Sequence, residues 1–264
     1  MFWKTLRMEL VRAVRPGKVC MVSLAFFILL LVSDWEMLRD FMVYGDFSGY
    51  GIVNKIYGLF FMDTFKCVLV ILMAGLYTSS FCKDDNNQYL RMVLARTDVT
   101  TYTQCRFIAN LCVMLLVSVI SLYLYVGVMW LLGMPLLLEK GAEGFFYREL
   151  AEKYPLVYVG MNGLVFGLIA TACSSIGLLY SSYKTNSFVC IGLSGLVFYM
   201  ALSYIPFGNP FCVQTIVSMG SVLGWEAPRI LMFLWSVTYM LAVTGICGLL
   251  FWRRMKWRVE NGYV

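Results

Sequence analysis

The stretch Phe107–Gly133, FIANLCVMLLVSVISLYLYVGVMWLLG, decides the fold class of this chain of 264 residues. It contains no charged residue. A helix needs about 17–25 apolar residues to cross the roughly 30 Å hydrocarbon core of a bilayer. In lipid, a single segment can pair all of its backbone amides internally only as a helix. The stretch therefore predicts a transmembrane helix.

Five further apolar stretches predict six spans in all: Val19–Ser33, Tyr57–Cys82, Leu156–Tyr180, Phe188–Ile205 and Ile230–Trp252. Hydrophobic residues make up 61% of the chain, and no long polar segment separates the stretches. We therefore expect an all-α, polytopic membrane protein whose residues 1–264 form one transmembrane domain.

Positive charge lies on alternate sides of these spans and predicts the orientation of the chain. If the termini and the loops 83–106 and 181–187 share one side, that side holds 14 of the 21 Lys and Arg residues and 5 of the 15 Asp and Glu residues. Its cations are Lys4, Arg7, Arg12, Arg15, Lys18, Lys83, Arg91, Arg96, Arg106, Lys184, Arg253, Arg254, Lys256 and Arg258. Short loops rich in Lys and Arg stay cytoplasmic. We expect a multi-pass protein of the bacterial plasma membrane with both termini in the cytoplasm.

Composition excludes several function classes. The net charge of +6 is explained by membrane orientation and by attraction to anionic lipid, so no nucleic-acid partner is expected. The chain has no histidine, which removes His-based catalysis and His-ligated metals. Its nine cysteines show no metal-ligand spacing. No G-x-x-x-x-G-K-[ST] loop is present, so any ATP and Mg²⁺ must be bound by another subunit. We expect no enzyme activity and no cofactor in this chain.

Residues 2–15 have the pattern of an amphipathic helix. Its apolar face carries Phe2, Trp3, Leu6, Leu10, Ala13 and Val14, and its opposite face carries Lys4, Arg7, Arg12 and Arg15. Pro16-Gly17 then breaks the helix. This pattern favours a helix over residues 1–18 that lies in the inner membrane interface. The alternative is a simple basic flank before the first span.

The loop 83–106, KDDNNQYLRMVLARTDVTTYTQCR, is unusually apolar for a segment between spans. Asp and Asn residues at its start favour a helix cap, followed by a short helix with Tyr89, Leu90, Met92, Val93 and Leu94. A break is expected near Thr97-Asp98, and Thr101 with Gln104 matches a capping box that would open the third span. Exposed apolar clusters on a loop usually mark a protein contact. The alternative is a surface helix that rests on lipid headgroups.

The order of these residues resembles a known family. An acidic cluster, a short helix ending in Leu-Ala-Arg, a Thr-Asp-Val-Thr turn and a basic residue at the third span look like the cytoplasmic loop of bacterial ATP-binding-cassette exporter permeases. We mean the six-span class that serves lantibiotic immunity, bacitracin resistance, and peptide and polysaccharide export. Members commonly have a Gly-containing run after the acidic cluster, where this chain has Asn86-Asn87-Gln88.

The resemblance implies that Tyr89 to Arg96 form a coupling helix that docks on a separate ATPase subunit. The implied contact residues are Tyr89, Leu90, Arg91, Val93, Leu94 and Arg96. It also implies a dimer of permease subunits, with identical or different partners, and Arg106 as the basic residue that opens the third span. An extracellular re-entrant segment over 206–229 is implied as well, in agreement with an apolar stretch too short to cross the membrane twice.

Two further features have alternative interpretations. Gly163, Gly167 and Ala170 lie on a small-residue face of the fourth stretch, which favours close helix packing either within the chain or against a second copy. Asp63 and Lys66 lie one turn apart in the second stretch. Charges at depth often line a transport path. The alternative is that both residues sit among the lipid headgroups.

The leading hypothesis is therefore the transmembrane subunit of an ATP-driven exporter. Few ionisable groups are available to hold a hydrophilic solute, so an amphipathic or hydrophobic substrate is expected, with a peptide first and a lipid or drug second. A secondary transporter driven by an ion gradient is the alternative, but it usually shows internal repeats and polar residues at mid-membrane. An intramembrane enzyme is disfavoured because Asp63 is the only carboxylate within a predicted span.

Overall fold

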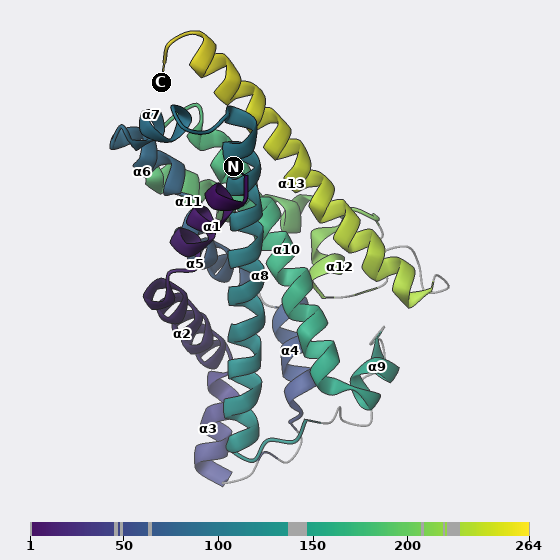
Figure 1. The fold of residues 1–264 in the computed structure, drawn as a ribbon. Helices are drawn as coiled ribbons and strands as arrows, with labels where there is room; N and C mark the ends of the chain where they lie inside the picture. Colours follow the sequence, from purple (N-terminus) through teal and green to yellow (C-terminus); the bar gives the residue numbers. More distant parts are fainter. Residues whose placement is uncertain are drawn as a thin grey trace.

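A computed structural model describes residues 2–44, 47, 50–62, 65–136, 147–206, 209–218, 220 and 228–263, and their regular structure is entirely helical (Figure 1). The helices are α1 (Phe2–Ala13), α2 (Pro16–Ser33), α3 (Trp35–Tyr44), α4 (Ile52–Met62), α5 (Lys66–Tyr77), α6 (Ser80–Asn86), α7 (Tyr89–Leu94), α8 (Val99–Leu131), α9 (Arg148–Lys153), α10 (Pro155–Ser181), α11 (Ser187–Tyr204), α12 (Val213–Val217) and α13 (Arg229–Glu260). The all-α class is confirmed.

Six helical segments in the described chain are long and apolar enough to cross a membrane. They are Pro16–Ser33, Lys66–Asn86, Val99–Leu131, Pro155–Ser181, Ser187–Tyr204 and Arg229–Glu260. Each overlaps one of the six predicted stretches. The number of candidate spans therefore agrees with the sequence, and the structure suggests a multi-pass membrane protein.

The second predicted stretch, Tyr57–Cys82, is not one helix. It is divided among α4, α5 and α6. At the first division, the Nζ atom of Lys66 donates a hydrogen bond of 2.8 Å to the carbonyl oxygen of Phe60, near the end of α4. A helix leaves its last carbonyls without internal partners, and a Lys side chain can satisfy one of them. Mean hydropathy does not reveal the turn at Thr78 and Ser79 that separates α5 from α6.

The centre of the bundle is the contact between α8 and α10. An added Cβ at Gly163 would lie 3.2 Å from the Cα atom of Val119, and one at Gly167 would lie 3.0 Å from the Cα atom of Leu115. The two backbones approach this closely because the glycines have no side chain. Ala170 is buried as well. Of the two alternatives for this small-residue face, the structure shows packing within the chain.

The start of α8 differs from its prediction. The N-cap is Asp98, whose Oδ2 accepts a 3.0 Å hydrogen bond from the backbone N–H of Thr101. The predicted capping box at Thr101 is therefore wrong by one turn, since Thr101 already lies within the helix. Asp and Thr are both good N-cap residues, and in this chain Asp98, the earlier of the two, begins the helix. The hydrogen bonds from Thr101 lower the pKa of Asp98.

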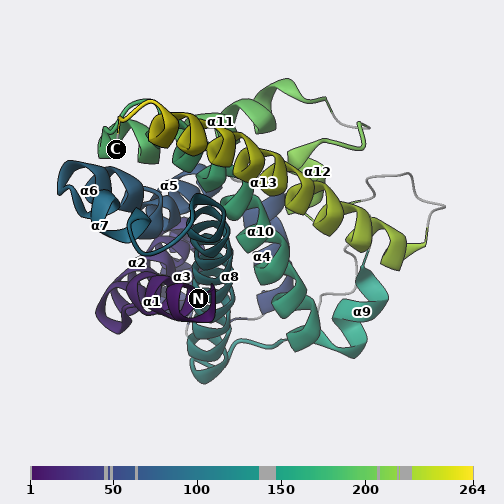
Figure 2. The same cartoon turned by 45° about the horizontal axis from the view of Figure 1, so that its top comes forward.

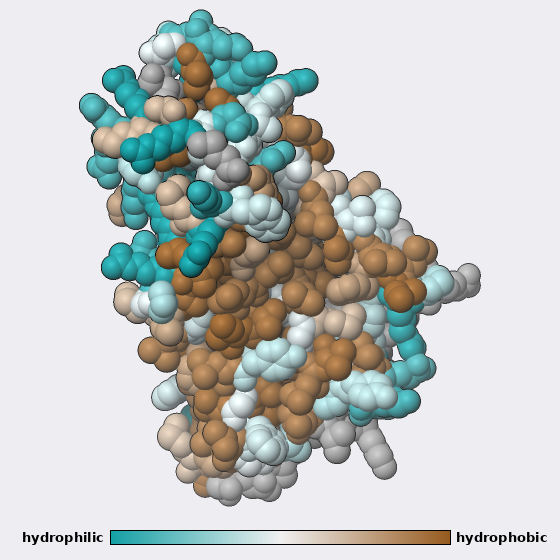
Figure 3. Space-filling model, viewed as in Figure 1, coloured by the Kyte–Doolittle hydropathy of each residue, from teal (hydrophilic) through white to brown (hydrophobic). Residues whose placement is uncertain are grey.

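The outer surface is divided between apolar helix flanks and a polar end. Apolar residues cover the sides of the long helices, and hydrophilic residues gather at the end that holds α6, α7 and both termini (Figure 3). Leu131, Phe188 and Ile230 are among the large apolar side chains that remain 81%, 88% and 72% exposed. Apolar patches of this extent mark contact with a membrane or with partners.

Two predicted segments are described only in part. Of the predicted re-entrant segment 206–229, the structure describes residues 206, 209–218, 220, 228 and 229, which include the short helix α12. Asp63 lies outside the described residues. The re-entrant arrangement and the pairing of Asp63 with Lys66 stay predictions.

Candidate functional site

Five elements meet at the polar end of the molecule. They are α1, α6, α7, the first turns of α8 and the C-terminal part of α13, and we call them the platform (Figures 1 and 2). Gln88 joins α6 to α7 in a left-handed conformation with φ of 56°, which turns the chain back on itself. The helix formed by Tyr89–Leu94 agrees with the short helix that the sequence predicts, and the break before Asp98 is also as expected.

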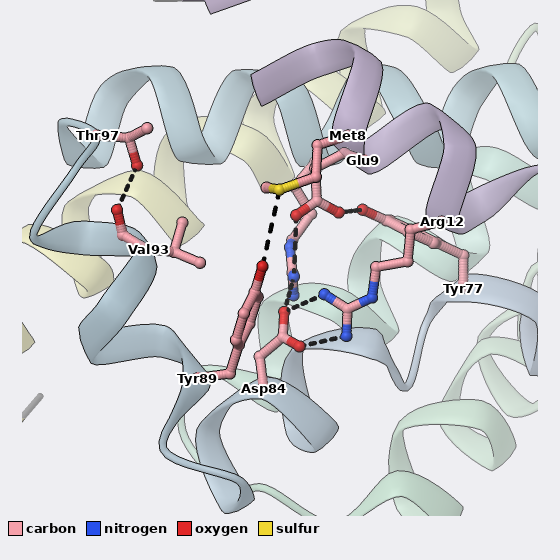
Figure 4. Close-up of polar contacts among 9 residues, drawn as sticks. Met8, Glu9, Arg12, Tyr77, Asp84, Tyr89, Val93 and Thr97 are labelled. Atoms are coloured by element: carbon pink, nitrogen blue, oxygen red, sulfur yellow. Dashed lines mark hydrogen bonds and ion pairs between the residues drawn. The ribbon is translucent and has the colours of Figure 1, made fainter. Parts of the chain in front are cut away.

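A buried ionic cluster connects α1, α6 and α8 of the platform with α5. We call it the Arg106 cluster and define it as Glu9, Arg12, Tyr77, Asp84 and Arg106. Arg12 donates from both terminal nitrogens to the carboxylate of Asp84, with Nη1 2.8 Å from Oδ2 (Figure 4). The Nη2 atom of Arg106 donates to the same Oδ2. Glu9 accepts a hydrogen bond from the hydroxyl of Tyr77, and its Oε1 lies 3.8 Å from Nη2 of Arg106.

Burial makes this cluster energetically demanding. The side chains of Glu9 and Arg106 are both 0% exposed, and removing charges from water costs several kcal/mol per ion unless they are paired. The two arginines balance the two carboxylates, so the cluster has no net charge. The hydrogen bonds to Asp84 raise the pKa of Arg12, which keeps this guanidinium charged.

Aromatic rings complete the surroundings of Arg106. Its guanidinium carbon lies 4.7 Å from the ring centroid of Tyr102, 5.6 Å from that of Phe81 and 5.9 Å from that of Tyr77. Cations are attracted to the faces of such rings, most strongly when water is excluded. Arg106 is thus held by carboxylates and by ring faces, at the point where α1, α5, α6 and α8 meet.

The apolar side of α7 faces its own chain, which corrects the sequence analysis. Leu90 and Val93 are only 1% and 6% exposed, and they pack in a cluster with Phe81, Tyr102, Phe107, Leu178, Cys247, Phe251 and Met255. Leu94 packs partly against the same cluster. The prediction that Leu90 and Val93 are exposed for a partner is wrong, because residues of α8, α10 and α13 already cover them.

The opposite side of α7 is open. Tyr89 and Met92 are 37% and 63% exposed, and Arg91 and Arg96 are exposed as well. Tyr89 remains tied to α1, because its hydroxyl lies 3.7 Å from the Sδ atom of Met8 (Figure 4) and its ring centroid lies 5.7 Å from the guanidinium carbon of Arg12. Of the six predicted contact residues, Tyr89, Arg91 and Arg96 therefore face outward.

The last helix also joins the platform. Arg258 of α13 donates from Nη2 to both carboxylate oxygens of Asp85, at 3.0 and 2.9 Å. Trp252 donates from Nε1 to the hydroxyl of Thr100 at 3.1 Å. The two acidic residues predicted to cap a helix, Asp84 and Asp85, instead lie inside α6 and form ion pairs with α1, α8 and α13.

The other predicted path residue, Lys66, is buried at the start of α5, outside the platform. Its side chain is 3% exposed and bonds to Phe60 as described above. A second buried carboxylate cluster, which the sequence did not reveal, lies near the start of α3. There Asp34 accepts a hydrogen bond from the hydroxyl of Tyr125 and lies 3.8 Å from the Nζ atom of Lys55.

The described residues contain no group of three or more His, Cys, Asp and Glu side chains that could hold a metal ion. Ion pairs among Glu9, Arg12, Asp84, Asp85, Arg106 and Arg258 connect α1, α6, α8 and α13 of the platform. Comparison of the chain with protein-family models, with curated proteins and with solved structures gave no match.

Proposed function

We propose that the chain is the transmembrane subunit of an ATP-driven exporter of the ATP-binding-cassette type. A separate ATPase subunit binds ATP and Mg²⁺, and a second permease subunit, identical or different, completes the translocation unit. The observation that supports this most is the α6–α7 pair. It presents an open side at the polar end of the molecule, while its other side is fixed to the long helices.

Both sides of α7 support a coupling role. Its outward side carries Tyr89, Arg91 and Met92, and Arg96 is exposed just after the helix ends, so cations lie beside two large, partly apolar side chains. Aromatic residues, Met and Arg are enriched at protein interfaces. Its inward side, with Leu90 and Val93, is packed in the core. A force applied to the outward side therefore reaches α8 and α13 through direct contacts.

The buried carboxylates favour this function over ion-driven transport. A proton- or ion-coupled transporter needs carboxylates that exchange their cation during the cycle. Among the described residues, Glu9, Asp84 and Asp34 are buried, and each faces an Arg or Lys side chain of the chain itself. Permanently paired groups of this kind serve structure better than ion exchange.

An apolar groove supports an amphipathic or hydrophobic substrate. It has a volume of about 610 Å³ and lies between α8 and α13. Its lining residues are Thr100, Thr103, Gln104, Phe107, Ile108, Leu111, Leu241, Thr244, Gly245, Gly248, Leu249 and Trp252. A surface with no ionisable side chain does not select hydrophilic ions. We infer a peptide as the first substrate class, with a lipid or a drug as the alternative.

The test is retention of an ATPase. The chain, tagged and expressed in its native host, is purified in mild detergent and assayed for a co-purified subunit that hydrolyses ATP. Met92→Asp places a charge at the centre of the exposed side of α7, and loss of such a contact lowers affinity by about tenfold or more. Lys256→Glu is the matched control, since it changes charge on an exposed side chain of the platform outside α7.

The expected result is ATPase retention in the wild type and in Lys256→Glu, with most of the activity lost in Met92→Asp. All three proteins should elute as single folded species. An ATPase that stays bound equally to all three would contradict the role of α7. Absence of any ATPase from the wild-type complex, together with uptake or export driven by an ion gradient, would overturn the exporter proposal.

A further inference from the structure

A second cavity, of about 630 Å³, lies where α10 ends, α11 begins and α13 passes. We call it the basic pocket. Its lining residues are Asp85, Ser182, Tyr183, Lys184, Thr185, Asn186, Arg254, Trp257, Arg258 and Tyr263. Unlike the α8–α13 groove, it is lined by charged side chains. It belongs neither to the Arg106 cluster nor to the outward side of α7.

The charge of the basic pocket is unbalanced. Lys184, Arg254 and Arg258 contribute three cations, and Asp85 contributes one carboxylate that Arg258 already binds through both oxygens. Within the described part of the chain, Arg254 has no acidic partner. This leaves an excess of two positive charges around one cavity. Such a surface attracts anions.

The arginine donors support a specific ligand chemistry. The Nε atom of Arg254 and the Nη1 atom of Arg258 are buried and have no hydrogen-bond acceptor among the described residues. Buried donors without acceptors are costly, and an anion with several oxygens would satisfy them. The planar guanidinium group matches the oxygens of a phosphate group, to which it can donate two parallel hydrogen bonds.

Two aromatic rings hold the guanidinium group of Arg254 in place. The guanidinium carbon of Arg254 lies 4.2 Å from the ring centroid of Trp257 and 4.8 Å from that of Tyr183. Stacking on two rings restricts the side chain, so less conformational entropy is lost when a ligand binds. Arg254 is thus oriented before any anion arrives.

The position of the pocket indicates the source of the phosphate. It lies at the junction of three candidate spans, since α10 ends at Ser181 and α11 begins at Ser187, beside the basic end of α13. Phe188, two residues after the pocket residue Asn186, is a large apolar side chain that is 88% exposed. Basic pockets between membrane helices on the cytoplasmic side bind the headgroups of anionic lipids. Tyr and Trp side chains are typical of the same interface.

We propose that the basic pocket binds a phosphate group, and that its source is the headgroup of an anionic phospholipid of the inner leaflet. Arg254 and Lys184 hold the phosphate oxygens, while Arg258 remains shared with Asp85. The proposal does not rest on the exporter function, because it concerns a different set of residues and a different ligand. A soluble phosphate compound has the same recognition chemistry and is the alternative source.

The experiment measures stabilisation of the purified chain by defined ligands. The full chain is placed in nanodiscs of phosphatidylcholine alone, or with added phosphatidylglycerol, and its thermal unfolding is followed; a third sample in phosphatidylcholine receives inorganic phosphate. Native mass spectrometry then counts the retained phosphatidylglycerol molecules. The variants are Arg254→Gln, Lys184→Gln and their combination. Arg253→Gln is the control, because Arg253 is an exposed neighbour on α13 that does not line the pocket.

We expect phosphatidylglycerol to stabilise the wild type and the control, with one tightly retained lipid. Each cation near an anionic lipid is worth about a fivefold change in affinity, so the double variant should bind about 25-fold more weakly. Equal stabilisation by inorganic phosphate would assign the pocket to a soluble ligand. Equal lipid retention by all variants would overturn the proposal.

Discussion

Arg106 is the residue on which the platform depends most. It is completely buried, it contacts Asp84 and Glu9, and three aromatic rings surround it. Asp84 has a second cation, Arg12, but Glu9 has no other cation within 4.0 Å among the described residues. The loss of Arg106 therefore affects the two carboxylates unequally, and Glu9 becomes the buried charge without a partner.

Because Asp84 has a second cation partner and Glu9 has none among the described residues, we can predict how substitutions of Arg106 and Glu9 combine. Arg106→Met should lower the free energy of unfolding by about 3–5 kcal/mol, the usual cost of breaking a buried ion pair on one side. Adding Glu9→Gln should restore part of that loss, because Asp84 keeps Arg12 and no unpaired charge remains. Unfolding in detergent by thermal or denaturant titration measures both values.

The control for this pair is Arg39→Met. Arg39 is 65% exposed and lies 3.8 Å from Asp40, so its ion pair is worth only about 0–1 kcal/mol. If the losses from Arg106→Met and Glu9→Gln simply add, the two residues do not share a cluster and the buried pairing is incorrect.

Among the helices, α10 and α11 approach each other closely at Gly177 of α10. A Cβ added there would lie 2.4 Å from the backbone oxygen of Cys190, 2.7 Å from Oγ of Ser194 and 2.7 Å from Cγ2 of Thr78. The first of these atoms belongs to the backbone of α11 and cannot rotate away. Gly177 therefore sets the distance between α10, α11 and the link from α5 to α6.

Gly177→Ala should destabilise the chain by about 1–3 kcal/mol, as overpacking of a close-packed core does. Gly192→Ala is the matched control. It lies on α11 with no atom within 4 Å of an added Cβ, and Ala is favoured over Gly in a helix by about 1 kcal/mol. Thermal unfolding of the two variants under identical conditions should shift in opposite directions. Shifts of the same sign and size would indicate that α11 does not pack on α10 as described.

The same helices show which features of the fold the sequence predicts and which it does not. Long apolar stretches predicted the candidate spans, because length and composition are local properties. The apolar residues of Tyr89–Leu94 predicted a short helix, but the predicted exposure of Leu90 and Val93 to a partner was wrong, because Phe251 and Met255, far along the chain, cover them. The pairing of Glu9, Asp84 and Arg106 was not predictable either, since isolated charges in a sequence carry no information about their partners.

For the whole molecule, charge and structure make a joint prediction about topology. The platform holds both termini and lies on the side of the predicted spans that holds 14 of the 21 Lys and Arg residues, so it should lie in the cytoplasm (Figures 1 and 3). Green fluorescent protein fused after Val264 should fluoresce, because it matures in the cytoplasm. Alkaline phosphatase fused at the same point should be inactive, because it becomes active only on the outer side of the membrane. Both reporters inserted after Lys153, at the end of α9, should give the reverse result. Phosphatase activity at Val264 would contradict this orientation.

The length of α8 has a consequence for any motion that begins at the platform. It is one uninterrupted helix of 33 residues, and at 1.5 Å per residue it is a rod of about 50 Å. Arg106 lies toward its platform end, and Tyr125, which bonds to Asp34, lies closer to its other end. A rod pivoting at one end amplifies displacement at the other: a tilt of about 6° moves the far end by about 5 Å, nearly the pitch of one helical turn. A small angular step imposed at α6 and α7 would thus displace Tyr125, about 39 Å along α8 from Val99, by about 4 Å relative to Asp34.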